Sequence, residues 1–242
     1  MLPELIYREE KSNDYRWLIV LGGLSGLVGY TAASFLFPSV SDILAVIFGA
    51  IPLVYPLTRE FLEDEEDKRP HIPEIKTYAA LFLGELFAFF LLGLTFPGVF
   101  QLQNSVFAGT GFATFTGSFL SILFHNFMVF LAIFAISTVI GSAGAFMLTW
   151  NASVMGVFFA KLVASIESTG GYFTCSPTPS PICYMPHATF EMTGFIVAGI
   201  AGSLVSAALY REHFDTDTWM DYGKLIALGV VLIILAAFLE TA

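Results

Sequence analysis

The chain has 242 residues, of which 56% are hydrophobic and 12% charged, and its mean hydropathy is +0.77. This composition excludes an ordinary soluble domain, because water cannot solvate so much apolar surface. The net charge of -10 falls largely in polar segments between apolar runs, so it does not indicate an acidic domain that seeks a basic ligand. We therefore predict an all-α integral membrane protein in which residues 1–242 form a single transmembrane domain.

Apolar runs of roughly 20 residues, the length that crosses a bilayer core about 30 Å thick, predict six to seven transmembrane spans. The runs cover residues 17–37, 43–57, 78–96, 119–146, 150–166, 186–210 and 225–239. The polar stretch before the first run lacks the features of a cleavable signal peptide, so this run is expected to stay in the membrane. The second run contains Pro52 and Pro56, which predict a kinked or tilted helix.

The segments between the spans carry the charge that predicts orientation. All basic residues except Lys161 fall in segments that lie on one side of a seven-span topology. The positive-inside rule makes this side cytoplasmic. The N-terminus and the loops 58–77 and 211–224 are then cytoplasmic in a cell membrane, and 97–118 and 168–185 are extracytoplasmic. Residues 97–118 are apolar but rich in glycine, and we expect them to be interfacial or re-entrant.

Both cysteines, Cys175 and Cys183, fall in the predicted extracytoplasmic loop 168–185. An oxidising compartment favours a disulfide over two free thiols. The intervening prolines restrict the chain, so closing the ring is expected to cost little additional entropy. A metal site is the weaker interpretation of this Cys-x7-Cys spacing.

Two stripes of small residues mark faces where helices approach closely. Gly22, Gly26 and Gly29 form the first stripe, and Gly194, Ala198, Gly202 and Ser206 form the second. Packing within the chain is the favoured interpretation, and a homo-oligomer interface is the alternative.

Ionisable residues inside spans are costly in lipid unless they face a partner, water or the bundle interior. Glu85 lies about 10 Å in from the cytoplasmic end of the third span, and Lys161 about 15 Å in along the fifth, so the two are expected to be buried charges able to pair. His187 and Glu191 share one face of the sixth span. His125 and Asn126 enter the fourth span from the same side, which predicts a polar intramembrane cluster of these four residues.

Two interpretations of this cluster remain open. A structural hydrogen-bond network is favoured, and a metal or proton site built from His125, His187 and Glu191 is the alternative, because two imidazoles and a carboxylate suit zinc. No catalytic motif is recognisable, so we expect no cofactor and consider an enzyme the less favoured class. Basic patches with interleaved aromatic residues are absent, which argues against nucleic acid as a partner.

The second half of the chain carries a family resemblance. Its elements are Phe124-His125-Asn126, a motif from Leu148 to Gly156 that includes Asn151, the segment Pro186-His187-Ala188-Thr189-Phe190-Glu191-Met192, and Ala198-Gly199-Ile200-Ala201-Gly202. Over residues 119–210 this pattern resembles the stage II sporulation protein M family of polytopic membrane proteins. The chain has Ala152 and Ala188 where that family pattern has glycine, which predicts costly positive φ angles at two turns.

The resemblance implies a non-enzymatic membrane scaffold or assembly factor, with membrane or envelope proteins as partners in the lipid bilayer. It names no client. A small transporter or channel that uses Glu85 and Lys161 is one alternative, and a membrane-embedded metalloenzyme that uses His125, His187 and Glu191 is another.

Overall fold

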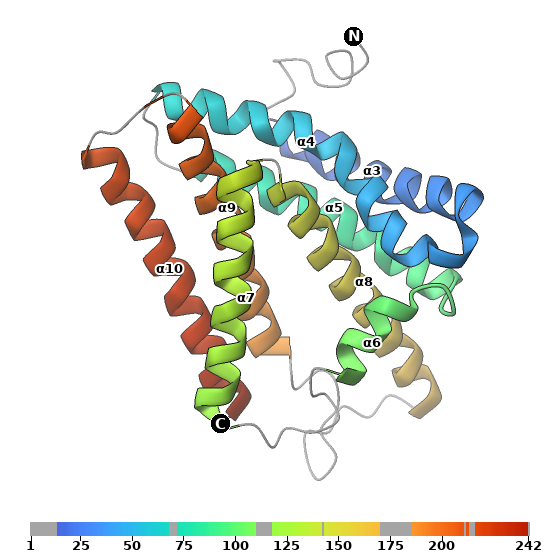
Figure 1. Cartoon of the computed structure of the whole chain (residues 1–242). Coiled ribbons are helices and arrows are strands. Elements are labelled where there is room, and N and C mark those ends of the chain that lie inside the picture. Colours follow the sequence, from blue (N-terminus) through green and yellow to red (C-terminus); the bar gives the residue numbers. More distant parts are fainter. Residues whose placement is uncertain are drawn as a thin grey trace.

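The computed structural model describes residues 14–67, 72–109, 118–141, 143–169, 185–210, 212 and 216–241. These ranges are helical and contain no strand (Figure 1). The α-helices are α3 (Tyr15–Leu36), α4 (Ser41–Asp67), α5 (Ile72–Thr95), α6 (Gln101–Gly109), α7 (Phe119–Ile140), α8 (Ala143–Thr169), α9 (Met185–Tyr210) and α10 (Thr216–Thr241), with a 3-10 turn at Pro38–Val40.

Within the described residues, seven helices are long and apolar enough to cross a membrane, namely α3, α4, α5, α7, α8, α9 and α10. The remaining helix, α6, has only 9 residues. At 1.5 Å per residue it spans roughly 14 Å, too little for a bilayer core. These findings confirm the predicted all-α class and the multi-pass membrane architecture.

The turn between the fourth and fifth spans lies earlier than the sequence suggested. The hydropathy pattern predicted a break at residues 147–149, whereas α7 ends at Ile140 and α8 begins at Ala143. Gly141 ends α7 with a φ of +60°, and its N–H donates to the Ser137 carbonyl. Glycine takes this positive φ without the steric cost that a Cβ would bring. Val139 and Ile140 before Gly141, and Ala143 and Ala145 after it, keep the local hydropathy high, so a hydropathy window does not find the turn.

The charged stretch after the second span was expected to be a loop over 58–77, but it is largely helical. α4 continues to Asp67, past Pro52 and Pro56, and α5 begins at Ile72. Glutamate, lysine, arginine and leucine are good helix formers in water, so a polar composition does not end a helix. Both α4 and α5 therefore extend further into the charged stretch than the hydropathy window predicted.

Neither alanine that replaces a family glycine lies in a turn. Ala152 is inside α8 and Ala188 is inside α9. Among the described residues only Glu212 and Gly141 have a positive φ. The predicted strain at these two positions is therefore wrong, because both fall in regular helix.

The helices form two groups that α8 joins. In the first group α3 packs against α4 and α5, and in the second α9 packs against α7 and α10. α8 contacts α4 and α5 on one side and α9 and α7 on the other. Figure 1 shows α7, α9 and α10 beside one another, away from α3.

Glycines allow the closest helix approaches within each group. A Cβ added at Gly22 would overlap the Leu81 carbonyl on α5, and one at Gly84 would overlap the Ile19 carbonyl on α3. In the second group, a Cβ at Gly202 would lie 2.5 Å from the Phe134 carbonyl oxygen on α7. The two small-residue stripes thus serve packing within the chain at these positions, as the favoured interpretation expected.

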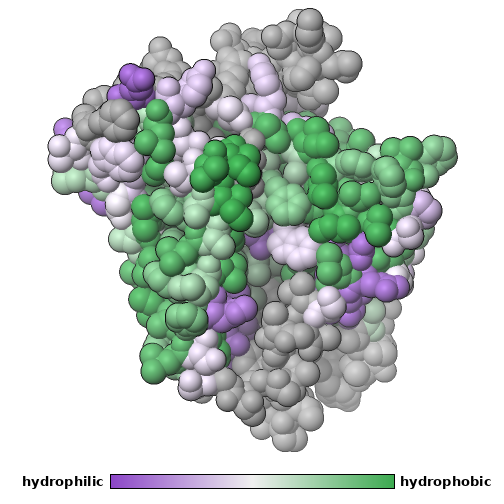
Figure 2. Space-filling model, viewed as in Figure 1, coloured by the Kyte–Doolittle hydropathy of each residue, from purple (hydrophilic) through white to green (hydrophobic). Residues whose placement is uncertain are grey.

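The outer surface is apolar over long stretches. Figure 2 shows hydrophobic residues over much of the face that α7 and α10 present. Phe35 at the end of α3 is 86% exposed, and Val139 on α7 is 83% exposed. In water such side chains would be unfavourable, whereas lipid solvates them.

Candidate functional site

Among the residues of the first helix group whose side chains the structure describes, Glu85 is the most deeply buried ionisable one. It lies on α5 with 0% of its surface exposed. The Thr149 hydroxyl on α8 donates to its Oε1 over 2.8 Å, and the same hydroxyl lies 3.0 Å from the Ala145 carbonyl oxygen. Among the described residues, Glu85 Oε2 has no hydrogen-bond partner. One carboxylate oxygen is thus tied to a neighbouring helix and the other is enclosed without a protein donor.

Small residues make room for this carboxyl group. A Cβ added at Gly49 on α4 would lie 3.6 Å from Glu85 Oε1 and 3.3 Å from the Thr149 methyl carbon. Gly84, next to Glu85 in the chain, lets α5 touch the backbone of α3. Four helices, α3, α4, α5 and α8, therefore close around the Glu85–Thr149 contact.

The expected partner of Glu85, Lys161, lies elsewhere. Its side chain is exposed, and among the described residues no ion pair joins it to Glu85. Thr149 and Lys161 are twelve residues apart on α8, or roughly 18 Å at 1.5 Å per residue. A lysine side chain cannot bridge that distance. The sequence placed α8 about seven residues too late, and this error moved Lys161 too close to Glu85 in depth.

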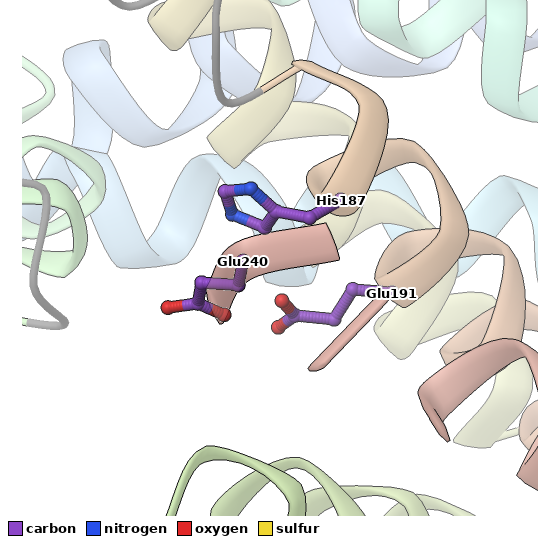
Figure 3. Close-up of side chains that lie close together, drawn as sticks. All are labelled: His187, Glu191 and Glu240. Atoms are coloured by element: carbon purple, nitrogen blue, oxygen red, sulfur yellow. The ribbon is translucent and has the colours of Figure 1, made fainter. Parts of the chain in front are cut away.

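A second polar group lies where α9 begins and α10 ends. His187, Glu191 and Glu240 each offer a ligand atom, and these atoms all lie within 4.8 Å of one another. His187 is 6% exposed, whereas Glu191 and Glu240 are half-buried. Figure 3 shows the three side chains gathered around one space, two from α9 and one from α10. We call this group the His187 cluster.

His125, predicted to join this cluster, is exposed on α7. The contact of Gly202 with Phe134 and Ser137 sets a parallel register between α9 and α7. This register puts residues 123–126 level with Glu191, so the depth derived from the sequence agrees with the structure. The orientation of α7 about its own axis places His125 on the outer surface of the bundle and not toward the cluster.

Asn126, also predicted to join the cluster, is buried, whereas its neighbour His125 is exposed. It is buried in a row with Phe130, Ile133 and Ser137 on one face of α7. Its Nδ2 has no hydrogen-bond partner among the described residues. The structure thus separates the four expected residues, keeping His187 with Glu191 and adding Glu240.

The remaining motif residues support helix packing. A Cβ at Gly156 on α8 would lie 2.7 Å from the Leu86 carbonyl oxygen of α5, and Gly202 plays the same part between α9 and α7. Pro186 lies in the first turn of α9, where a missing N–H is tolerated. Asn151 is buried on α8 and borders a crevice with Tyr78 and Gly199 that has no room for a water molecule.

Cys175 and Cys183 lie in residues 170–184, outside the described residues, and the predicted disulfide is not seen in the structure.

Two residues of these polar groups, Glu240 and Thr149, were not predicted from the sequence to belong to them. Glu240 directly follows the last predicted span, 225–239, where a charge is unremarkable at a membrane surface. Thr149 lies within the motif from Leu148 to Gly156, and a threonine in a helix usually bonds its own backbone. Helix periodicity offered a weak signal for Glu240: it lies seven residues after Ile233, on the same face of α10.

A family model described as stage II sporulation protein M matches residues 19–242. No curated protein and no solved structure matches the chain.

Proposed function

The chain belongs to the stage II sporulation protein M family, and we propose that it acts as a non-enzymatic membrane scaffold or assembly factor. The observation that carries this proposal is the packing of the first helix group. The Glu85 carboxyl group, which is fully buried, is enclosed by four helices and bonded to Thr149, an arrangement that fixes these helices relative to one another. A rigid bundle with apolar outer faces suits a protein that holds membrane partners in place.

Partners of such a scaffold bind through its lipid-facing helices. The outer faces of α3 and α7 carry large exposed side chains such as Phe35 and Val139. These faces offer apolar area and shape to another transmembrane helix, which is how helices associate in lipid. The clients expected are therefore membrane or envelope proteins with their own spans, or a second copy of the chain.

Site-specific photocrosslinking in native membranes tests the scaffold. A photoreactive residue at Phe35 or Val139 is expected to give an adduct of defined mass, whereas the same residue at Leu18, which is 0% exposed, gives none. An adduct of twice the chain mass identifies a homo-oligomer. Absence of any adduct from the exposed positions, in membranes where a known complex cross-links normally, contradicts the proposal.

The second candidate, a small transporter or channel, is favoured by the enclosed Glu85 carboxyl group. Ionisable residues inside spans mark proton and ion pathways in many membrane proteins. Among the described residues, Glu85 Oε2 has no hydrogen-bond partner. Purified protein in liposomes distinguishes the two functions. Solute or ion flux that the Glu85→Gln variant abolishes would replace the scaffold by a transporter.

We also propose that the protein lies in a cell membrane with its N-terminus on the cytoplasmic side. Lys76 stands over the Tyr15 ring, 5.7 Å from its centroid, so the basic starts of α3 and α5 share one end of the bundle. In a chain without native cysteines, a thiol at Asp64 or Asp217 is expected to react only after permeabilisation. A thiol at Ser105 is expected to react in intact cells. Reaction of the Asp64 variant from outside inverts the topology.

A further inference from the structure

We propose that His187, Glu191 and Glu240 bind a divalent first-row transition metal, with zinc the best fit, where α9 begins and α10 ends. This inference does not depend on the scaffold function. It rests on the geometry of the His187 cluster, which brings one buried imidazole and two carboxylates from two helices together.

The packing of α9 against α10 fixes the register that creates the cluster. A Cβ at Gly194 would lie 2.9 Å from the Ile233 Cδ1 atom and 3.3 Å from the Gly229 carbonyl oxygen, so the two helices touch there. The helices are antiparallel, and seven residues are close to two turns. Glu240, seven residues after Ile233, therefore stands opposite His187, seven residues before Gly194.

Two further features keep the three donors on one side. Glu191 lies four residues after His187, which places both on the same face of α9. Figure 3 shows the three labelled side chains close together, with His187 and Glu191 on α9 and Glu240 on α10 beside them. The donors thus come from rigid helices whose mutual position is set by glycine contacts deeper in the bundle.

The distances match a metal site that closes slightly on binding. Zinc takes nitrogen and oxygen ligands at about 2.0 to 2.2 Å, so two ligands of a tetrahedral site are roughly 3.4 Å apart. The donor atoms of the cluster lie within 4.8 Å of one another. Rotation of the two glutamate side chains, both half-buried, is enough to bring them closer.

Charge gives the cluster a reason to hold a cation. Two ionised carboxylates side by side repel each other, and Glu240 stands in the last turn of α10, where the helix macrodipole is negative. A divalent ion neutralises both carboxylates at once. The imidazole decides which ion, because nitrogen ligands favour zinc and similar metals, whereas magnesium and calcium prefer oxygen alone.

Three protein ligands leave a fourth position of the zinc open. A water molecule or a donor from a partner fills it. The cluster links the start of α9 to the end of α10, so the bound ion would fasten these two helix ends together.

Metal analysis of the full chain tests the site. The protein is purified in detergent by a tag without histidines, stripped with a chelator, dialysed against zinc and analysed by mass spectrometry. One zinc per chain is expected. Glu240→Gln, Glu191→Gln and His187→Ala are each expected to weaken binding by at least about 100-fold, because even changes behind the ligands cost 10- to 100-fold.

Two variants serve as matched controls. His125→Ala removes an exposed histidine of α7, and Asp221→Asn removes an exposed carboxylate of α10. Both are expected to bind zinc as tightly as the unaltered chain. The far-UV circular dichroism of every variant, measured without metal, is expected to keep the helical signal of the unaltered chain, which separates a loss of zinc binding from a loss of folding.

Four results would overturn the proposal. The first is a chain that binds no zinc after dialysis. The second is a Glu240→Gln variant, folded as judged by dichroism, that binds zinc like the unaltered chain. The third is displacement of zinc by an equal concentration of calcium or magnesium, which would contradict the role of the imidazole. Loss of binding on His125→Ala alone would place the ion in a different site and refute the ligand set.

Discussion

Glu85 and the His187 cluster both place carboxyl groups inside the helix bundle, but they differ in how far these groups are buried. Glu85 is enclosed by α3, α4, α5 and α8 and bonded to one threonine. The His187 cluster lies at the ends of two helices, with two of its three members half-buried. The single buried Glu85 carboxyl group holds neighbouring helices in place through Thr149. The three donor groups of the His187 cluster lie close enough together to share an ion. Depth and number of donors therefore separate the enclosed Glu85 carboxyl group from the metal site proposed at the His187 cluster.

The largest effect is expected from a substitution at Gly84, where α5 touches the backbone of α3 beside Glu85. In Gly84→Ala, the new Cβ would overlap the Ile19 carbonyl oxygen and lie 2.7 Å from the Gly23 nitrogen. Both are backbone atoms, so α3 itself must move, and a loss of about 3 kcal/mol of stability is expected. Thermal unfolding in detergent measures it.

Gly223→Ala on α10 is the matched control, because nothing lies within 4 Å of its new Cβ. Its stability should rise by about 0.5 to 1 kcal/mol, because alanine is the better helix former and its Cβ meets no neighbour. Equal unfolding temperatures for the two variants would show that α3 and α5 do not touch at Gly84.

A smaller loss is expected when the Glu85 carboxyl group loses its donor. Thr149→Val keeps the shape of the side chain but removes the hydroxyl that donates to Glu85, which should cost about 1 to 3 kcal/mol. Thr31→Val is the control, because the exposed Thr31 hydroxyl bonds only its own helix at Leu27. If both variants unfold at the same temperature, the enclosed carboxyl group contributes nothing through Thr149.

At the His187 cluster, apolar replacement should cost less because the site is only partly enclosed. Glu191→Leu leaves polar groups of the cluster without a partner, at a cost of about 1 kcal/mol, while Glu191→Gln keeps a hydrogen-bonding amide and should be milder. Chemical unfolding of both variants without metal compares them. Identical stabilities would mean that Glu191 is not part of a polar group at all.

The smallest effect is expected for Glu240→Gln in metal-free protein. Removing one of two neighbouring carboxylates relieves repulsion, so stability should rise by less than about 0.5 kcal/mol. Added zinc should then raise the unfolding temperature of the unaltered chain but not of this variant. Asp221→Asn should respond to zinc as the unaltered chain does. A rise in the unfolding temperature of Glu240→Gln on adding zinc would contradict the distinction between the enclosed Glu85 carboxyl group and a metal-binding His187 cluster.

Hydropathy alone determined the class of this protein and the approximate position of its seven spans. Apolar length is a property of local sequence, so a sliding window finds it without knowing the neighbours of a helix. The same reasoning located Glu85, His187 and Glu191 as residues that need a partner. The family resemblance over residues 119–210 also came from local motifs, and the family match extends it to residues 19–242.

Tertiary structure decided which partner each residue found. The early turn at Gly141 moved α8 along its axis, which gave Glu85 the Thr149 hydroxyl in place of Lys161. The rotation of α7 exposed His125, and the antiparallel register at Gly194 brought Glu240 to His187. Axial shift, rotation and register depend on contacts between residues far apart in the chain. Hydropathy carries no record of them, because lipid and a neighbouring helix are equally apolar surroundings for a span.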